Sequence, residues 1–93
     1  MRHAARRDVI EPAVIATLAQ IGIPYRPVSC PALGDLEVIL AGRPWLIEVK
    51  SGNARYSPAQ LARRQWLRDN GVDVDAECPT WRSVEDIFRW LGQ

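Results

Sequence analysis

The stretch Leu33–Gln60, LGDLEVILAGRPWLIEVKSGNARYSPAQ, contains the pattern that decides the fold. Its β-branched residues predict one strand over Leu36–Leu40 and another over Trp45–Ser51, joined by the turn AGRP. Ser57 followed by Pro58 predicts a helix start, with the serine as N-cap and the proline in the first helical position. We therefore expect a hairpin followed by a capped helix in the middle of the chain.

The flanking segments predict further helices and strands. Apolar residues recur at helical spacing before Gly22, which should end that helix. A short segment broken by Pro27 predicts an edge strand. Alternating apolar and acidic residues predict a late strand, and Ser83 with Asp86 predicts a final helix with a capping box. The elements expected outside the hairpin are a helix over 8–21, a strand over 25–30, a helix over 57–70 ended by Gly71, a strand over 72–78 and a helix over 83–91.

The order helix, strand, strand, strand, helix, strand, helix favours the α/β class. The third strand, the helix after it and the fourth strand form a crossover unit, which should place these two strands parallel. We predict a single domain over residues 1–93 with a mixed four-stranded sheet flanked by helices. A flexible basic arm is expected at 1–7.

Composition narrows the possible classes of protein. A chain of 93 residues with 47% hydrophobic content can enclose one modest core. No apolar run approaches the roughly 20 residues that cross a bilayer, and the basic N-terminus lacks the apolar region of a signal peptide. We therefore expect a cytoplasmic protein with no membrane partner. Two cysteines and one histidine favour neither a disulfide scaffold nor a zinc site.

The cations of this chain have an unusual distribution. Of its twelve lysines and arginines, Lys50 is the only lysine, while the net charge of +1 gives no indication of nucleic acid. Lysine carries a compact ammonium and arginine a planar guanidinium, so the two are not equivalent beside a metal or a phosphate. Lys50 is therefore a candidate functional residue, although chance survival in an arginine-rich composition explains the same fact equally well.

Asp35, Glu48, Lys50 and Gln60 form a chemically meaningful set. Antiparallel pairing should bring Asp35 and Glu48 to the same end of the sheet, where they would repel unless a hard divalent cation lay between them. Such an ion polarises a phosphoryl oxygen and lowers the pKa of a bound water. Lys50, on the same strand face as Glu48, can stabilise transition-state charge. Gln60 can orient the water or hold a carboxylate, so the set predicts a phosphodiester-cleaving site.

These motifs resemble the VRR-NUC domain of the PD-(D/E)XK nuclease superfamily, in its minimal stand-alone phage and bacterial form. The similarity consists of an early helix with a glutamate, then G-D-L-x-V, I-E-V-K-S-G and S-P-x-Q, and it spans about 7–91. It implies a restriction-endonuclease-like αβββαβ core with an added C-terminal helix, and a DNA endonuclease that uses Mg²⁺ or Mn²⁺. The implied catalytic residues are Asp35, Glu48, Lys50 and Gln60, and the implied metal ligands are Asp35, Glu48, Val49 through its carbonyl, and Glu11.

At Glu11 the resemblance adds a role that the residue alone does not indicate, and at Gly34 the chain departs from the family's pattern. Taken by itself, Glu11 is explained as an acid stabilised by the N-terminal end of a helix dipole, and the resemblance makes it a site residue. The family usually has a proline before the aspartate, where this chain has Gly34.

Side chains around the set are candidates for contact with DNA. Arg55 and Tyr56 lie in the loop before the middle helix, and Tyr56 is expected to be exposed there. Arg63 and Arg64 share a helix face with Gln60 and could meet phosphates, although a solvated face is an equal alternative.

The resemblance favours structured DNA as the substrate, above all a four-way (Holliday) junction, and a homodimer that makes paired cuts. Trp66, Trp81 and Trp90 are expected in the core or in an interface, with apolar surface at Trp81 or Trp90 left for the partner. Three alternatives remain open: a monomeric flap or nicking nuclease, a catalytically silent nucleic-acid-binding module of the same fold, and a small protein-interaction domain.

Overall fold

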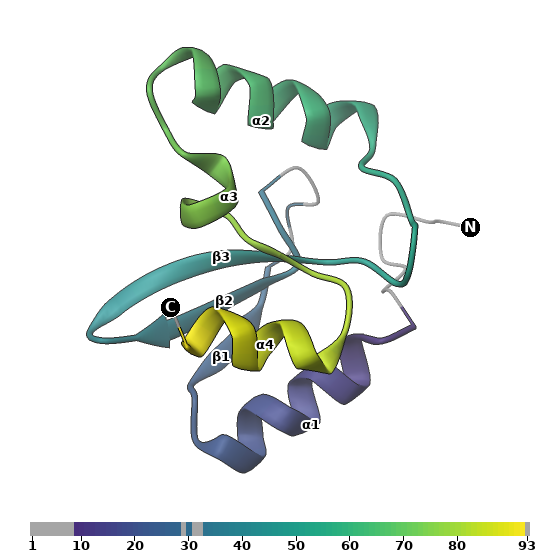
Figure 1. Ribbon diagram of the computed structural model, residues 1–93, viewed down its shortest axis with the longest axis vertical. Coiled ribbons are helices and arrows are strands. Elements are labelled where there is room, and N and C mark those ends of the chain that lie inside the picture. The colour runs from purple at the N-terminus through teal and green to yellow at the C-terminus, as the bar shows by residue number, and fades with distance from the viewer. Residues whose placement is uncertain (1–8, 29, 31–32, 93) are drawn as a thin grey trace.

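The computed structural model describes residues 9–28, 30 and 33–92. The arm expected at 1–7 lies outside the described residues. Over the described part, the chain is an α/β protein with a four-stranded mixed sheet and helices on both faces (Figure 1). The elements in chain order are α1 (Glu11–Ile21), β1 (Tyr25–Pro27), β2 (Leu36–Leu40), β3 (Arg43–Val49), α2 (Pro58–Asp69), α3 (Val74–Glu77), β4 (Thr80–Trp81) and α4 (Val84–Leu91).

The sheet has the order β1-β2-β3-β4. The first three strands form an antiparallel meander, and β4 pairs parallel to β3, as the crossover predicted. The predicted edge strand exists but is shorter than expected and ends at Pro27, although the N–H of Val28 still donates to the carbonyl of Asp35 over 2.9 Å. The hairpin turn is tighter than expected. Ala41 and Gly42 both have positive φ, 56° and 73°, which is the two-residue geometry that matches strand twist, so β3 starts two residues early at Arg43.

The strand predicted over 72–78 is wrong. That segment contains the short helix α3, whose N-cap Asp73 accepts a hydrogen bond from the N–H of Ala76. Val74 is buried while the acids beside it face outward, so the apolar–acidic alternation belongs to one helical turn. The fourth strand falls later, at Thr80–Trp81, and pairs with Glu48 and Val49.

The predicted ends of the longer helices are largely confirmed. α1 has Pro12 in its first turn and ends at Gly22, although it begins at Glu11 and not at Asp8. Ser57 caps α2 as expected. The capping box predicted for α4 is wrong: Ser83 is the N-cap residue but makes no side-chain capping bond, and Asp86 accepts the N–H of Arg82 instead.

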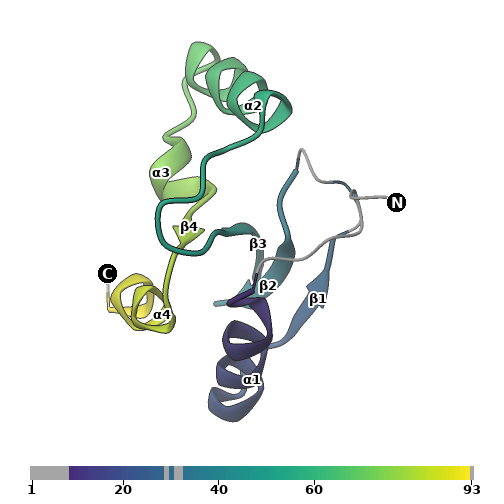
Figure 2. The ribbon, with the colours of Figure 1, turned by 90° about the vertical axis from the view of Figure 1, so that its right-hand side faces the viewer.

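The two faces of the sheet have different interiors. α1 and α4 cover one face, and α2 with α3 covers the other (Figure 2). The apolar core lies on the α1–α4 side, and it includes Val14, Leu18, Leu36, Val38, Ile47, Val49, Trp81 and Ile87. Beneath α2, by contrast, the buried residues Glu48, Gln60 and Arg64 are polar or charged. Polar residues are seldom buried in this way, so this cluster is a candidate functional site.

The tryptophans divide between core and surface. Trp81 is 1% exposed, which confirms its place in the core and makes the expected partner surface at Trp81 wrong. Trp90 is half-buried and packs edge-on to Trp81 and to Trp45, with ring centroids 5.4 Å apart in both pairs. Trp66 on α2 is 62% exposed and is not a core residue. Among the described helices, none is long and apolar enough to cross a membrane.

Candidate functional site

The β2–β3 hairpin brings Asp35 and Glu48 together. Asp35 lies just before β2 and its N–H donates to the carbonyl of Ile47 over 2.9 Å. Its Oδ2 accepts the N–H of Val49 over 2.8 Å. Glu48 lies between these two β3 residues, on the face opposite the apolar core. The convergence expected from antiparallel pairing is therefore present.

Gln60 holds the Glu48 carboxylate in a fixed orientation. Its Nε2 donates to Oε2 of Glu48 over 2.7 Å, and both side chains are buried. Its Oε1 accepts the N–H of Ser57, while Ser57 Oγ accepts the N–H of Gln60, which completes a capping box. One side chain thus joins the start of α2 to the acid on β3. The sequence predicted the N-cap and the role of Gln60 separately, and the structure links them.

Burial raises the pKa of Glu48 from 4.5 to about 7, and the nearby charge of Asp35 acts in the same direction. Lys50, Arg64 and Arg63 oppose this shift but do not cancel it. Two carboxylates compete for one desolvated space, so the second is costly to ionise there. A cation bound between them would remove that cost, which is the environment that a divalent metal favours.

We expect the free energy of unfolding to fall as pH rises from about 5 to about 7.5 in EDTA. Between pH 4.5 and about 7, Glu48 keeps its proton in the folded state and loses it in the unfolded state. The folded state then binds more protons, so its stability is greatest below this window and declines through it. The full shift corresponds to roughly 3–4 kcal/mol.

Urea unfolding followed by tryptophan fluorescence at several pH values measures this decline. Glu48→Gln cannot titrate, and its amide can still accept the bond from Gln60. Its free energy of unfolding should therefore lack the part of the decline with pH that Glu48 causes. If the wild type and Glu48→Gln change in parallel across the window, the raised pKa of Glu48 is refuted.

The metal ligands implied by the resemblance are only partly brought together. Among the described residues, no three histidine, cysteine, aspartate or glutamate side chains lie close enough to bind one metal ion. Glu11 is buried in the first turn of α1 and does not complete such a group with Asp35 and Glu48. The pair of carboxylates, with the carbonyl of Val49, still fits Mg²⁺, which commonly binds one or two carboxylates and keeps several waters.

Lys50 follows β3 directly and is anchored by its backbone. Its N–H donates to the carbonyl of Trp81 over 3.0 Å, which continues the parallel pairing with β4. Its Nζ lies 6.0 Å from the centroid of the Tyr56 ring, within range of a cation–π interaction. The side chain is half-buried, and its charge acts on Glu48. Lys50 is thus a neighbour of Glu48.

Tyr56 is less exposed than its loop position predicted. Its side chain is half-buried, and its hydroxyl shares a hydrogen bond with that of Thr80 on β4. The guanidinium of Arg64 lies 4.7 Å from the ring centroid. Tyr56 therefore connects the entry to α2 with the edge strand of the sheet, and its ring is placed among cations.

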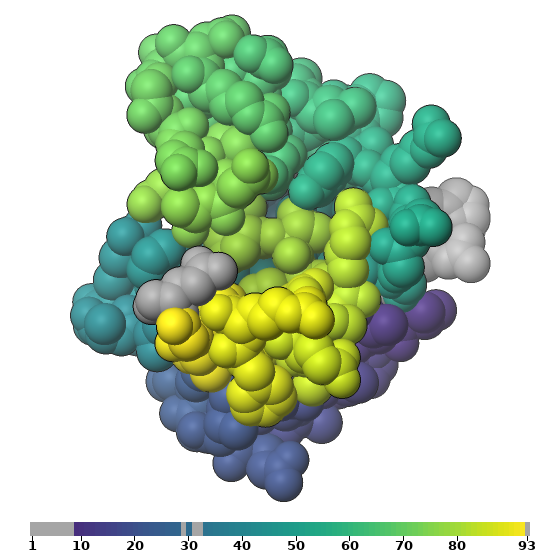
Figure 3. All heavy atoms as spheres, viewed as in Figure 1, coloured from purple at the N-terminus to yellow at the C-terminus, as the bar shows by residue number. Residues whose placement is uncertain are grey.

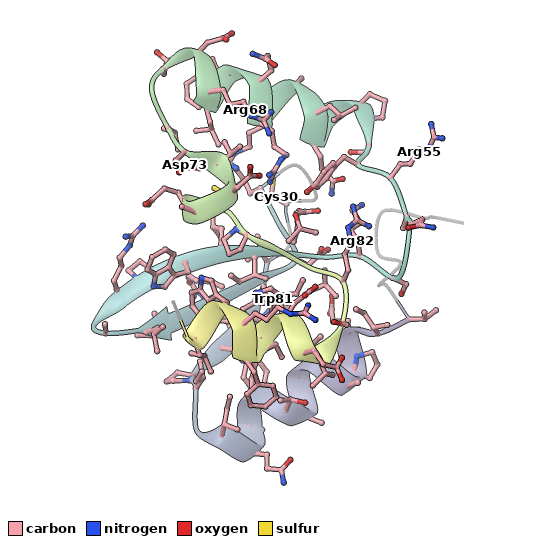
Figure 4. The ribbon with its side chains drawn as sticks, in the orientation of Figure 1. Cys30, Arg55, Arg68, Asp73, Trp81 and Arg82 are labelled. Carbon is pink, nitrogen blue, oxygen red and sulfur yellow. The ribbon has the colours of Figure 1, made fainter. Side chains whose placement is uncertain are left out.

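The four residues predicted to contact DNA have different environments. Arg55 is exposed and points away from the sheet (Figure 4). Arg63 is half-buried, with Nη1 4.0 Å from the sulfur of Cys78. Arg64 is only 6% exposed and donates to the carbonyl of Cys78 and to Asp75, both over 3.1 Å. The face that carries Gln60 and Arg64 packs against the sheet, so the alternative of a solvated helix face is wrong for Arg64.

Gly34 adopts a conformation that the family's proline cannot. Its φ is 141°, whereas proline is fixed near −65°. A Cβ at this position would lie 3.2 Å from the carbonyl oxygen of Ile47 and 3.7 Å from Oε1 of Glu48. Glycine therefore allows the backbone before Asp35 to approach Glu48 closely, by a different entry into β2.

Arg82 belongs to this region, although the sequence analysis did not single it out. Its Nη1 donates to the carbonyl of Gly52 over 2.9 Å and to that of Ala54 over 2.8 Å, and its guanidinium lies 5.9 Å from the Tyr56 ring (Figure 4). Arg82 thereby ties the loop between Lys50 and α2 to the segment after β4. These partners are 28 and 30 residues away, so no local pattern predicts them.

The described site thus consists of two converging carboxylates, one lysine and a glutamine held by a helix cap. Arg63 and Arg64 line the small pocket that contains Glu48 and Gln60. Comparison of the chain with known protein families, with curated proteins and with solved structures gives no match.

Proposed function

We propose that this chain is a divalent-metal-dependent DNA endonuclease. The observation that supports this most directly is the convergence of the half-buried Asp35 on the buried Glu48, with Lys50 beside Glu48. A buried carboxylate with a second carboxylate close to it is costly to ionise unless a cation compensates the two charges. A domain that used this face only for packing would gain nothing from keeping two acids there.

The order of the elements supports a restriction-endonuclease-like fold. A helix, three antiparallel strands, a helix and a parallel fourth strand follow one another, and α4 closes the chain. The short α3 between α2 and β4 is an addition to the αβββαβ order. We therefore propose the fold of the PD-(D/E)XK superfamily, with the VRR-NUC domain as the group that the motifs resemble.

In the proposed reaction, Asp35, Glu48 and the carbonyl of Val49 would hold Mg²⁺ or Mn²⁺. When bound, the metal would supply Lewis-acid activation of the scissile phosphate and lower the pKa of a water. Gln60 fixes the orientation of the Glu48 carboxylate by donating to its Oε2. Lys50 places an ammonium where negative charge develops on the phosphoryl oxygens.

The proposed substrate is branched DNA in the cytoplasm, and the proposed assembly is a homodimer. Resolving a four-way junction requires two symmetric cuts, which two subunits related by a two-fold axis can deliver. Among the described residues, the large apolar side chains exposed on the helices are Ile21 on α1, Leu61 and Trp66 on α2, and Phe88 on α4. These residues replace Trp81 as the apolar surface available to a partner.

Cleavage of a panel of branched and linear DNAs with Mg²⁺, with Mn²⁺ and with EDTA tests this proposal. We expect cleavage that requires a metal and is fastest on a four-way junction, because the acids cannot act without the ion. Light scattering on the same preparation should give a dimer. A monomer that cuts flaps as fast as junctions would favour the flap nuclease, and junction binding without cleavage would favour the silent module.

A further inference from the structure

A groove on the outer side of β4 lies next to the proposed site. It has a volume of about 300 Å³ and runs between the α2–α3 layer and α4, where the surface is hollowed in Figure 3. Its floor is β4 itself, which forms the edge of the sheet. Its lining combines the aromatic residues Tyr56, Trp81 and Trp90 with two arginine–aspartate pairs, Arg64 with Asp75 and Arg89 with Asp86.

Tyr56 joins this groove to the proposed site. Its ring lines the groove, and the Nζ of Lys50 lies 6.0 Å from the ring centroid. Its hydroxyl is bound to Thr80 on the floor of the groove. A DNA strand whose phosphate lies at Lys50 therefore has the groove as the adjoining surface on the β4 side.

The lining suits one nucleotide of an unpaired strand. Aromatic side chains stack on bases of any sequence, and arginine binds phosphate. Tyr56 and Trp90 are half-buried aromatics at this surface, and the side chain of Arg89 is 70% exposed. A volume of 300 Å³ is at the small end of ligand sites, which admits a single nucleotide and excludes a double helix.

The exposed arginine of the groove, Arg89, can exchange its present carboxylate partner for a phosphate. Arg89 is paired with Asp86, its neighbour one turn earlier on α4. The arginine of this pair is exposed, and a surface ion pair contributes little stability, so a phosphate that arrives with a stacked base can displace the carboxylate. Asp86 would keep its bond to the N–H of Arg82.

We propose that this groove binds an unpaired nucleotide of the strand that the neighbouring site cuts, with the base against Tyr56 and Trp90 and the phosphate at Arg89. The inference deepens the proposed nuclease function and rests on it. Within branched DNA, it makes the preferred cleavage position one at which the strand is unpaired beside the scissile phosphate. Such nucleotides occur at flaps and at branch points.

Two matched charge reversals test the groove. Arg89→Glu alters the groove, and Arg26→Glu on β1 alters the opposite edge of the sheet. Both arginines are exposed and paired with one carboxylate, Arg26 with Glu37. The probe is a fluorescent single-stranded oligothymidylate, titrated by anisotropy in EDTA at low salt. We expect Arg89→Glu to weaken binding at least about tenfold and Arg26→Glu less than about twofold.

A photocrosslink locates the bound strand directly. An oligothymidylate with one 5-iodouracil should crosslink to peptides that contain Tyr56 or Trp90. If binding weakens equally in the two variants, or if crosslinks are confined to peptides from other faces, the proposal that the strand binds in this groove is refuted.

A cleavage assay separates this inference from the proposed function. With Mg²⁺, a Y-shaped DNA with two unpaired arms should be cut faster than the fully paired duplex, and Arg89→Glu should lower that preference. Absence of cleavage on all DNAs together with Arg89-dependent binding of the oligothymidylate would refute the nuclease and retain the groove. Cleavage whose preference for Y-shaped DNA is unchanged in Arg89→Glu would retain the nuclease and refute the groove.

Discussion

Asp35→Asn should abolish metal-dependent cleavage and leave the fold intact. The amide cannot supply the charge that a divalent ion requires, and metal activation of a phosphoryl group is worth several kcal/mol, or at least about a hundredfold in rate. The fold should persist because the amide oxygen at position 35 can still accept the N–H of Val49, as the carboxylate does now over 2.8 Å. Initial cleavage rates on a junction with Mg²⁺ measure the effect.

The same substitution should raise stability in EDTA at neutral pH. The charge of Asp35 is one of the causes that raise the pKa of Glu48, so removing it relieves repulsion in the folded state. A gain of about 1 kcal/mol would raise Tm by roughly 4–8 °C in a domain of this size. Lost activity together with gained stability identifies an acid that is kept for function.

Glu37→Gln is the matched control. It makes the same carboxylate-to-amide change on β2, where Glu37 pairs with Arg26. Its cleavage rate should stay within about twofold of wild type, as is usual for an exposed ion pair. Wild-type cleavage by Asp35→Asn would show that Asp35 is not a metal ligand.

The parts of the fold that local sequence determines were predictable. β-branched strands flank a turn, Ser57-Pro58 begins a helix, and Gly22 ends one, because each signal acts within a few residues. The hairpin alone then places Asp35 beside Glu48, since antiparallel register follows from the turn. The central acids of the candidate site were therefore accessible without the structure.

The remaining features depend on contacts between distant segments. The apolar–acidic alternation at 72–78 fits a strand and a helical turn equally well, and packing of Val74 beneath α2 decides for the helix. Arg64 was expected at the surface, but the crossover turns its side of α2 onto the sheet. The clamp that Arg82 forms on the loop before α2 has no local signal at all.

The residues beneath α2 also show why the burial of a side chain could not be predicted from its polarity. Glu48, Gln60 and Arg64 are each less than 8% exposed, although residues of these types are usually at the surface. They are buried because each has a polar partner: the cap of α2 orients Gln60, Gln60 holds Glu48, and Arg64 donates to the carbonyl of Cys78 and to Asp75. Such mutual satisfaction is a property of the assembled site and of none of its segments.

Lys50→Arg should lose most of the cleavage activity even though the charge is kept. A planar guanidinium is longer than an ammonium and cannot occupy the same point beside the two acids and a phosphate. Loss of one donor that stabilises transition-state charge costs about 100- to 1,000-fold in turnover. Single-turnover cleavage of a junction with Mg²⁺ measures this loss.

Two further measurements separate catalysis from a surface-charge role for Lys50. The backbone N–H at position 50 would still donate to Trp81, and arginine can stack on Tyr56 at least as well as lysine does. Junction binding in EDTA, its salt dependence and Tm should therefore match wild type. Arg55→Lys, the reverse exchange at an exposed loop position, should cut normally. Near-normal turnover in Lys50→Arg would show that the single lysine of the chain is only a surface charge. A loss confined to turnover would identify it as the group that stabilises the transition state.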